Sequence, residues 1–245
     1  MKRRHLRRPF QAALLILPAF LAGAVLRSRR EILLEAVHAP VSRAGEYKLD
    51  PEERPHTLAE WQAVNPEVRL LLKFFQEDAV RILPVLETHD GEYYMNHNLY
   101  HQYDCMGALF ADASLCPLAA SQNWIISGHS SRTRDWNLTF LKQYADKEYY
   151  RSHSCLEVEE ESGTSCYRVA SFGRYDLKKE ETYLGWTANR FADREEVLEM
   201  FRNTEPHLLN RTDGLQYKGQ RILTLVTCDM ESADARFVLQ ALEEV

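Results

Sequence analysis

From residue 79 to the C-terminus the sequence is a succession of short apolar stretches separated by polar turns. Stretches rich in β-branched and aromatic residues predict strands, and the turn at residues 161–164 predicts a hairpin. The expected strands are residues 79–86, 93–95, 107–111, 124–127, 155–160, 167–172, 221–227 and 235–242, the last of which also fits a helix. Many short strands favour a closed antiparallel barrel, so the predicted fold class is mainly β with helical insertions.

Helical patterns interrupt and precede these strands. Residues 138–153 have apolar residues at helical spacing, and residues 193–203 form an amphipathic pattern with acidic residues in the first turn. Upstream, Thr57 and Glu60 form the capping-box pattern that opens a helix. Residues 67–77 form another apolar-faced segment, which we count as a second short helix before the first strand.

The N-terminus determines the compartment. Residues 9–26 are an apolar run of 18 residues, preceded by five Lys/Arg in residues 1–8 and followed by three in residues 27–30. A helix of this length spans roughly 27 Å, enough to cross a bilayer core of about 30 Å. The excess of positive charge before the run favours an N-terminus inside the cell. A cleaved signal peptide, or a buried or surface helix, is the alternative.

These features give a four-part organisation. We expect a cytoplasmic tail at residues 1–8, a transmembrane signal anchor at 9–26, an extracellular helix and linker at 27–56, and a catalytic domain at 57–245. Everything after the anchor then lies outside the cytoplasm, on a single-pass membrane protein. The net charge of −6 argues against nucleic acid as a partner, because such a partner calls for a basic face.

Three residues are candidates for chemistry: His129, Cys228 and Arg236. Each follows or lies on an expected strand. Each alone has a simpler interpretation, as a turn histidine, a small buried hydrophobic residue and a solvated surface charge. Together they fit acyl transfer, since a cysteine reacts as its thiolate and needs a proton partner. The oxyanion that forms also needs a fixed donor or positive charge, which arginine supplies.

The residues around these three resemble the sortases, and class B sortases in particular. The likeness runs in order from about residue 57 to the end, and the Thr-Leu-Val-Thr-Cys run with an upstream Gly-His and a downstream Arg is specific as a set. Two short helical segments before the first strand and a helix in residues 174–220 favour class B. The segments that carry the resemblance are residues 84–87, 94–98, 107–112, 123–129, 222–229 and 234–238.

The resemblance implies an eight-stranded sortase barrel with His129, Cys228 and Arg236 in its groove. It implies a cysteine transpeptidase of Gram-positive bacteria that cleaves a C-terminal sorting signal of a secreted protein after Thr. The acceptor would be an amine of a lipid-linked peptidoglycan precursor or a pilin Lys, and no metal or organic cofactor is needed. Val226 and the Ser130-Ser131 pair depart from the pattern expected for class B, which weakens any inference about the sorting motif.

Several alternatives stay open. A cysteine hydrolase with water as acceptor would share Cys228 and His129, and a membrane-tethered binding domain would have a structural cysteine. A different cell-wall transpeptidase fits less well, because its cysteine would follow a Gly- and Ser-rich run. The remaining cysteines are buried free thiols or form the pairs Cys155–Cys166 and Cys105–Cys116.

Overall fold

The computed structural model describes residues 56–77, 79–178, 186–232 and 234–244. The predicted tail (1–8), the predicted anchor (9–26) and all but the last residue of the predicted linker (27–56) lie outside these ranges. Among the residues that are described, no helix is both long enough and apolar enough to cross a membrane.

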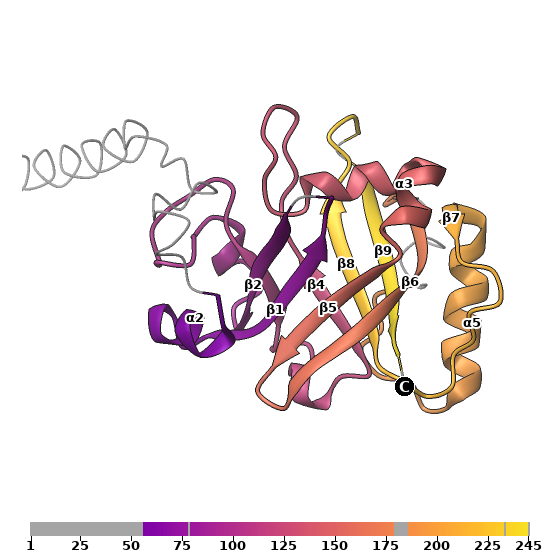
Figure 1. Cartoon of the computed structure of the whole chain (residues 1–245), viewed down its shortest axis with the longest axis horizontal. Helices are drawn as coiled ribbons and strands as arrows, with labels where there is room; N and C mark the ends of the chain where they lie inside the picture. The colour runs from indigo at the N-terminus through magenta and orange to yellow at the C-terminus, as the bar shows by residue number, and fades with distance from the viewer. Residues whose placement is uncertain (1–55, 78, 179–185, 233, 245) are drawn as a thin grey trace, which may run out of the picture. The chain divides into compact units, whose positions relative to one another are not determined.

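The strands form one sheet that closes on itself. Their order is β5-β1-β2-β3-β4-β8-β9-β6-β7, and β6 also pairs with β5, so eight strands make a ring and β7 extends it beside β6 (Figure 1). The predicted eight-stranded barrel is therefore confirmed, with a ninth, short strand added. The strands are β1 (Val68–Phe75), β2 (Val80–Thr88), β3 (Leu109–Asp112), β4 (Asn123–Ser127), β5 (Cys155–Glu160), β6 (Gly163–Asp176), β7 (Leu208–Arg211), β8 (Ile222–Cys228) and β9 (Ala235–Glu243).

The sequence predicts an antiparallel barrel, but two of the strand pairs are parallel. β2 pairs with β3, and β4 with β8, in parallel. A parallel pair cannot be joined by a tight hairpin, and both pairs are linked by long excursions, the second of which contains β5, β6 and α5. The parallel pairing of β4 and β8 brings the carboxyl ends of these two strands to the same edge of the barrel.

The α-helices are α2 (Leu58–Val64), α3 (Lys147–Ser152) and α5 (Arg194–Thr204), with 3₁₀ helices η1 (Tyr93–Met95), η2 (Leu118–Ala120), η3 (Thr139–Ala145) and η4 (Glu205–His207). The capping box at Thr57 and Glu60 is present at the start of α2. The predicted helix at 138–153 is instead η3 followed by α3, because the Asp146 side chain caps a new helix by accepting from Glu148 and Tyr149.

Two predictions from sequence were wrong in type. The second helical segment, residues 67–77, is β1, whose neighbours are β2 and β5. Leu70 and Leu72 pack in the barrel interior, and Val68 and Leu71 pack in the cluster on the α2 side. The apolar run of β1 is therefore continuous rather than alternating. Short runs of this kind fit strand and helix equally. The strand expected at residues 93–95 is η1.

Helix α5 lies along the outside of the barrel, beside β6 and β7 (Figure 1). Its buried Val197 and Met200 pack with Ile222 at the start of β8 and Leu242 near the end of β9. Burial on both faces explains why β8 reads as a nearly unbroken run of Ile, Leu, Val and Thr. A central strand buried in this way is a rigid support for the residue that ends it.

Candidate active site

Cys228 is the last residue of β8, and Arg236 lies near the start of β9. The two strands form an antiparallel ladder in which Cys228 and Arg236 are direct partners. Side chains of directly opposite residues lie on the same face of a sheet, with Cβ atoms about 4.5–5.5 Å apart. Both residues are half-buried, so the ladder presents a thiol and a guanidinium side by side at the rim of the barrel.

His129 reaches the same rim from β4. The parallel ladder pairs Ser127 with Val226, and the Gly128 amide donates to the Val226 carbonyl at 3.1 Å. The Thr227 hydroxyl donates to the Gly128 carbonyl at 2.8 Å, which ties the residue before Cys228 to the residue before His129. The structure thus brings together all three residues that the sequence singled out.

The thiol and the imidazole influence each other directly. The side-chain hydrogen bond with His129 is the largest cause that lowers the pKa of Cys228; the charge of Arg236 adds to it, and burial opposes it. The same hydrogen bond is the largest cause that raises the pKa of His129, the Met95 carbonyl adds to it, and burial and Arg236 oppose it. Both shifts favour a thiolate beside an imidazolium, which is the reactive state of a cysteine nucleophile.

The Met95 carbonyl fixes the orientation of the histidine ring. It lies 2.8 Å from Nε2 of His129, and a carbonyl can only accept, so Nε2 carries a proton. This leaves Nδ1 as the ring nitrogen that exchanges a proton with the thiol. Gly107 makes the arrangement possible: its φ is +55°, and a Cβ there would overlap the Tyr94 carbonyl oxygen and lie 2.9 Å from that of Met95.

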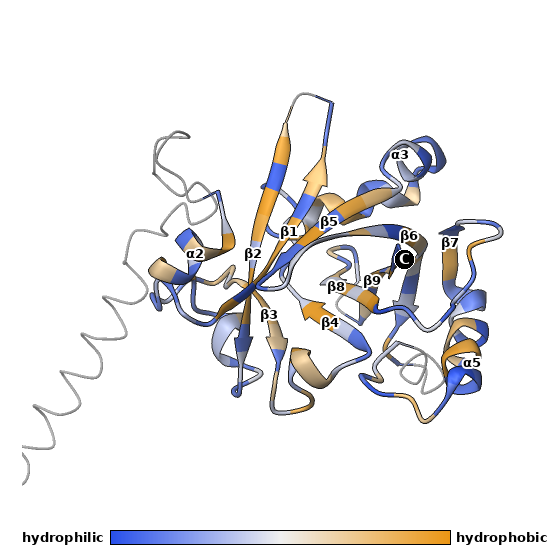
Figure 2. Ribbon diagram, turned by 60° about the horizontal axis from the view of Figure 1, so that its bottom comes forward, coloured by the Kyte–Doolittle hydropathy of each residue, from blue (hydrophilic) through white to orange (hydrophobic). Residues whose placement is uncertain are grey.

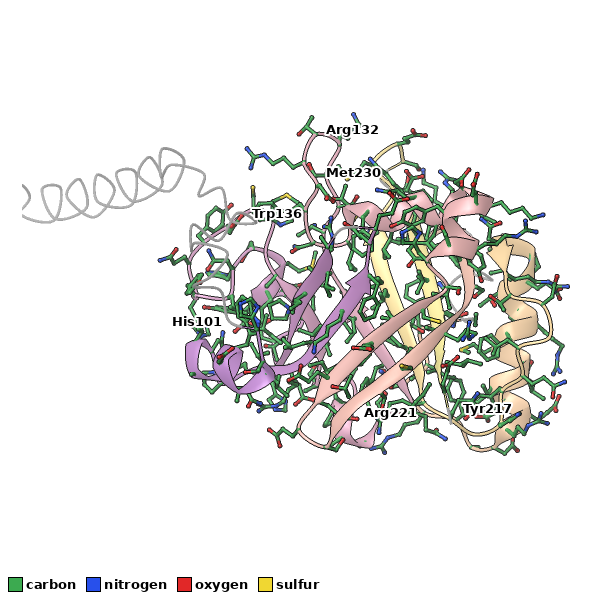
Figure 3. The ribbon with its side chains drawn as sticks, in the orientation of Figure 1. His101, Arg132, Trp136, Tyr217, Arg221 and Met230 are labelled. Atoms are coloured by element: carbon green, nitrogen blue, oxygen red, sulfur yellow. The ribbon has the colours of Figure 1, made fainter. Side chains whose placement is uncertain are left out.

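The turn between Cys228 and Arg236 is held from two sides. Asp229, whose side chain is 4% exposed, accepts from Arg174 Nε at 2.7 Å. Arg132, in the loop after His129, donates through Nε to the Met230 carbonyl at 2.7 Å. Figure 3 shows Arg132 and Met230 facing each other at the same end of the barrel. These contacts connect the histidine loop, the cysteine turn and β6.

This arrangement can perform acyl transfer. Cys228 supplies a nucleophile, His129 can donate and accept a proton, and Arg236 supplies a positive charge next to both. The Arg236 guanidinium also donates through Nη1 to the Ala235 carbonyl at 2.9 Å, which restrains the side chain. No group of three His, Cys, Asp or Glu with metal-binding geometry occurs in the described part of the chain.

A sequence comparison agrees with this geometry. No family model matches the chain. It is 28% identical to "Sortase B" of Listeria monocytogenes over 160 residues, which is 64% of this chain and 62% of the Listeria protein.

The chain is a homologue of the class B sortases.

Solved structures of class B sortases share its fold. The sortase B of Clostridium perfringens superposes with a TM-score of 0.67 at 23% identity, over 76% of this chain and 99% of that one. A sortase B–substrate complex from Staphylococcus aureus superposes with a TM-score of 0.64 at 19% identity, over 91% of this chain and 98% of that one. At these identities the superposition establishes a common fold and no more.

Sequence reasoning missed three residues around the site of this sortase homologue: Met95, Arg132 and Arg174. Met95 acts through its backbone carbonyl, which no side-chain pattern reveals. Arg174 contacts Asp229 only because β6 lies beside β9 in the ring. For the Arg174 contact, the one available signal in the sequence was Asp229, immediately after Cys228, since a buried carboxylate requires a partner.

The five cysteines of the sortase homologue are all free thiols. Cys155 and Cys166 lie on paired strands but are not opposite each other, because Cys155 faces Arg168 and Cys166 faces Glu157. Neither alternative disulfide forms, and Cys228 is the thiol with a histidine partner.

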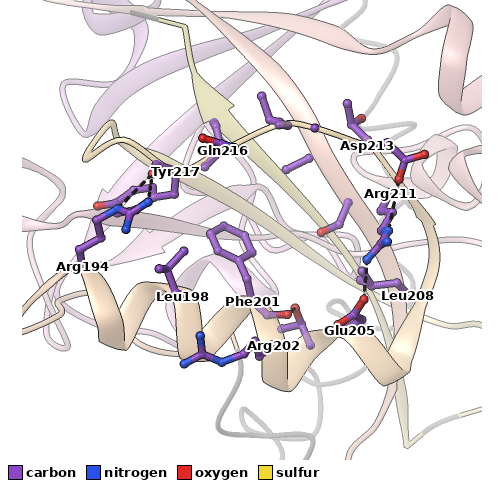
Figure 4. Close-up of a pocket in the computed structure, with 17 residues that line it drawn as sticks. Arg194, Leu198, Phe201, Arg202, Glu205, Leu208, Arg211, Asp213, Gln216 and Tyr217 are labelled. Atoms are coloured by element: carbon purple, nitrogen blue, oxygen red, sulfur yellow. Dashed lines mark hydrogen bonds and ion pairs between the residues drawn. The ribbon is translucent and has the colours of Figure 1, made fainter.

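A separate hollow of about 430 Å³ lies between α5 and the loop after β7 (Figure 4). Its charges are already satisfied: Arg194 donates to the Tyr217 carbonyl, and Arg211 pairs with Glu205 and Asp213. Its floor includes Leu242, the ladder partner of Ile222, at the far end of β8 from Cys228. Ile222 and Cys228 are six residue steps apart along the strand, about 20 Å, so this hollow is not part of the candidate active site.

Proposed function

We propose that the protein is a membrane-anchored extracellular cysteine transpeptidase, with Cys228 as nucleophile, His129 as proton donor and acceptor, and Arg236 as the cation that supports the transition state. The observation that carries this proposal is the convergence of the three side chains at the end of β8. There the hydrogen bond with His129 lowers the pKa of the Cys228 thiol. The kinship with class B sortases supports the reaction class.

In the first half-reaction, the Cys228 thiolate attacks the carbonyl carbon of a Thr in a sorting motif near the C-terminus of a secreted protein. The carbonyl becomes a tetrahedral oxyanion, beside the Arg236 guanidinium. His129 then donates its proton to the leaving amine, the peptide bond breaks, and a thioester remains on Cys228. Atoms and charges balance without any further reactant.

In the second half-reaction, an amine attacks the thioester carbon and gives its proton to His129. The Cys228 thiolate leaves, and a new amide joins the secreted protein to its acceptor. The acceptor is an amine of a lipid-linked cell-wall precursor or of a pilin Lys. The reaction needs a thioester that survives until the amine arrives, so access of water to the site must be limited.

The proposed location follows from the apolar run at residues 9–26. As a signal anchor it would hold the catalytic domain outside the cytoplasm, next to the membrane where secreted substrates and lipid-linked precursors meet. Expression of the full chain with a C-terminal tag, followed by protease treatment of intact cells, tests this. Loss of the tag is expected, and protection of the tag in intact cells with loss after lysis would contradict it.

The activity is tested with a library of peptides that contain Thr before the scissile bond. We expect a peptide adduct on Cys228 in intact-protein mass spectra, release of free peptide in water, and a ligated product when triglycine is added. Cys228→Ala and Cys228→Ser should give none of these. Cleavage with no ligated product at any amine concentration would indicate a hydrolase, and full activity in Cys228→Ala would overturn the proposal.

A further inference from the structure

His129 and Cys228 follow two paired strands at the point where the pairing ends. β4 and β8 lie side by side in the barrel wall (Figure 2), and their parallel ladder stops short of both residues. The last tie before them is the hydrogen bond from the Thr227 hydroxyl to the Gly128 carbonyl. Two side chains held from one side alone can separate, so the geometry of this pair depends on what lies beyond it.

Arg132 supplies a tie beyond the pair. Its guanidinium donates through Nε at 2.7 Å, and also through Nη2, to the Met230 carbonyl (Figure 3). Arginine suits this contact because its planar fork presents several donors in a fixed geometry. The contact joins residues 130–138, which we call the histidine loop, to residues 229–232, which we call the cysteine turn. Within the described residues, no other hydrogen bond or ion pair joins these two segments.

Ser131 fixes the direction from which Arg132 approaches. Its hydroxyl accepts from the amides of Thr133 at 3.3 Å and Arg134 at 3.2 Å, which closes a tight turn around Arg132. Its own amide donates to the hydroxyl of the buried Thr139 at 2.8 Å. Ser131 belongs to the pair of serines at which the sequence departs from the class B pattern. This departure therefore builds the turn that directs Arg132 toward the cysteine turn.

The cysteine turn is a firm partner for Arg132. Oδ1 of Asp229 accepts from the Glu231 amide at 2.9 Å, and Oδ2 of the same carboxylate accepts from Arg174 at 2.7 Å. The turn is thus closed and anchored through the buried Asp229. The Met230 carbonyl takes no part in this closure within the described residues, so it is available to a donor from the histidine loop.

The histidine loop has a second ion-paired attachment, on the side away from the thiol. Asp135 pairs with Arg81 of β2. In the order of the strands, β2 and β8 lie on opposite sides of β4, which leads to His129. The pair with Arg81 therefore holds the loop on the side away from Cys228, and Arg132 holds it on the side of the thiol.

We propose that Arg132 is a positioning residue for the transpeptidation: aimed by Ser131, it ties the histidine loop to the cysteine turn and so keeps the imidazole of His129 within reach of the Cys228 thiol. This inference rests on the proposed function. Catalytic groups have to be held within about 0.5 Å of their productive geometry, and a tie on each side of the pair serves this purpose.

The first test needs no substrate. The rate of alkylation of Cys228 by iodoacetamide is measured against pH in the full-length protein and in Arg132→Ala. Because the hydrogen bond with His129 lowers the pKa of the thiol, a loosened ring should move the profile to higher pH, by less than His129→Ala does. Arg134→Ala is the matched control: it removes the same charge from the same loop, and this exposed side chain forms no hydrogen bond or ion pair within the described residues. An unmoved profile in Arg132→Ala, or an equal shift in Arg134→Ala, would overturn the inference.

The second test separates positioning from binding and from stability. In Arg132→Ala, the single-turnover rate of thioester formation at saturating peptide should fall by about three- to thirtyfold, while the peptide concentration that gives half of this rate should change by less than about twofold. The unfolding temperature should stay nearly unchanged, since Arg132 is exposed. A loss confined to the half-saturating concentration would mean that Arg132 binds the peptide, and unfolding at a much lower temperature would mean that it supports the fold. Either result would overturn the inference.

Ser131→Ala tests how Arg132 is aimed. It removes the hydroxyl that closes the turn, so the rate of thioester formation should fall by less than in Arg132→Ala. The double variant should be no slower than Arg132→Ala, since both substitutions act through one contact. Losses that multiply in the double variant would overturn the role given to Ser131.

The two proposals fail in different ways. Absence of a thioester with every peptide would overturn the proposed function alone, because the alkylation profile does not depend on a substrate. A thioester that forms at the same rate in Arg132→Ala as in the wild type would overturn the positioning role of Arg132 alone.

Discussion

Cys228 and Arg236 are held by a continuous antiparallel ladder, whereas His129 is held by a few contacts from two loops. The ladder runs from Ile222 and Leu242 to Cys228 and Arg236 without a register shift. His129 relies on the Met95 carbonyl, the Leu138 amide and the residues that flank it. The proposed nucleophile and its cation thus have a rigid foundation, and the proposed proton-transfer group has an adjustable one.

The comparison separates two ways of losing activity. On the ladder side, the backbone geometry does not depend on the side chains that react, so a substitution should remove chemistry and leave stability intact. On the loop side, a substitution far from the reacting atoms can misplace the ring, and small displacements have large effects on catalysis. The predictions below test this difference, from the largest expected effect to the smallest.

The largest effects are expected from the reacting side chains. His129→Ala should lower kcat/KM for peptide cleavage by about 10²–10⁴-fold, the range that positioned proton transfer contributes. Arg236→Ala should lower it by about 10²–10³-fold, as loss of one transition-state stabilising group does. Thermal unfolding should be nearly unchanged for both, since both side chains are half-buried at the rim. An inactive Arg236→Ala protein that also unfolds at a much lower temperature would contradict the rigid ladder.

Gly107→Ala tests the loop side. The added Cβ would overlap the Tyr94 carbonyl and crowd that of Met95, so the acceptor of His129 should move. We expect kcat to fall by at least about tenfold, within the range set by the loss of proton transfer. Gly214→Ala is the matched control: its φ of +76° carries the same backbone strain, but no atom lies within 4 Å of the new Cβ. Equal losses of activity in the two variants would show that strain, rather than the Met95 carbonyl, is responsible.

The same difference explains what the sequence could predict. β8 and β9 were found within one residue of their ends, because a central strand packed on both faces requires a run of β-branched and apolar residues. Cys228 and Arg236 followed from these strands. His129 was found through its Gly-His motif, and the resemblance to sortases joined the three.

The contacts that hold His129 were not predictable in this way. Residues 93–95 have strand composition, but they form η1, which presents the Met95 carbonyl to the ring. The contact of Arg132 with a backbone carbonyl likewise leaves no trace in the pattern of side chains. β3 pairs only with the second half of β2, from Val85 onward, a feature of register that periodicity does not encode. Parallel pairings across long excursions are beyond what local sequence specifies.

Arg174→Ala tests the support behind the cysteine turn. It would leave the buried Asp229 carboxylate without its ion-pair partner, so we expect a loss of about 1–3 kcal/mol in the free energy of unfolding. Arg168→Ala is the matched control, because its pair with Glu244 is exposed on both sides and should contribute less than about 1 kcal/mol. Chemical denaturation measures both. Asp229→Asn in the Arg174→Ala background should recover part of the loss, and equal losses in the two single variants would contradict a structural role for Asp229.

The smallest effect distinguishes the two neighbours of the thiol. His129 is the largest cause that lowers the pKa of Cys228 and Arg236 is a lesser one, so the rate of alkylation of Cys228 should begin to rise at a lower pH than for an ordinary thiol. His129→Ala removes the larger cause and should shift the pH profile upward; Arg236→Ala should shift it in the same direction by less. Iodoacetamide labelling with peptide mapping measures this site by site, with the exposed Cys105 as an internal reference. Because the thiol and the imidazole titrate as a pair, the apparent pKa in the wild type belongs to both. A larger shift in Arg236→Ala than in His129→Ala would mean that the ladder partner, rather than the loop-held histidine, creates the thiolate.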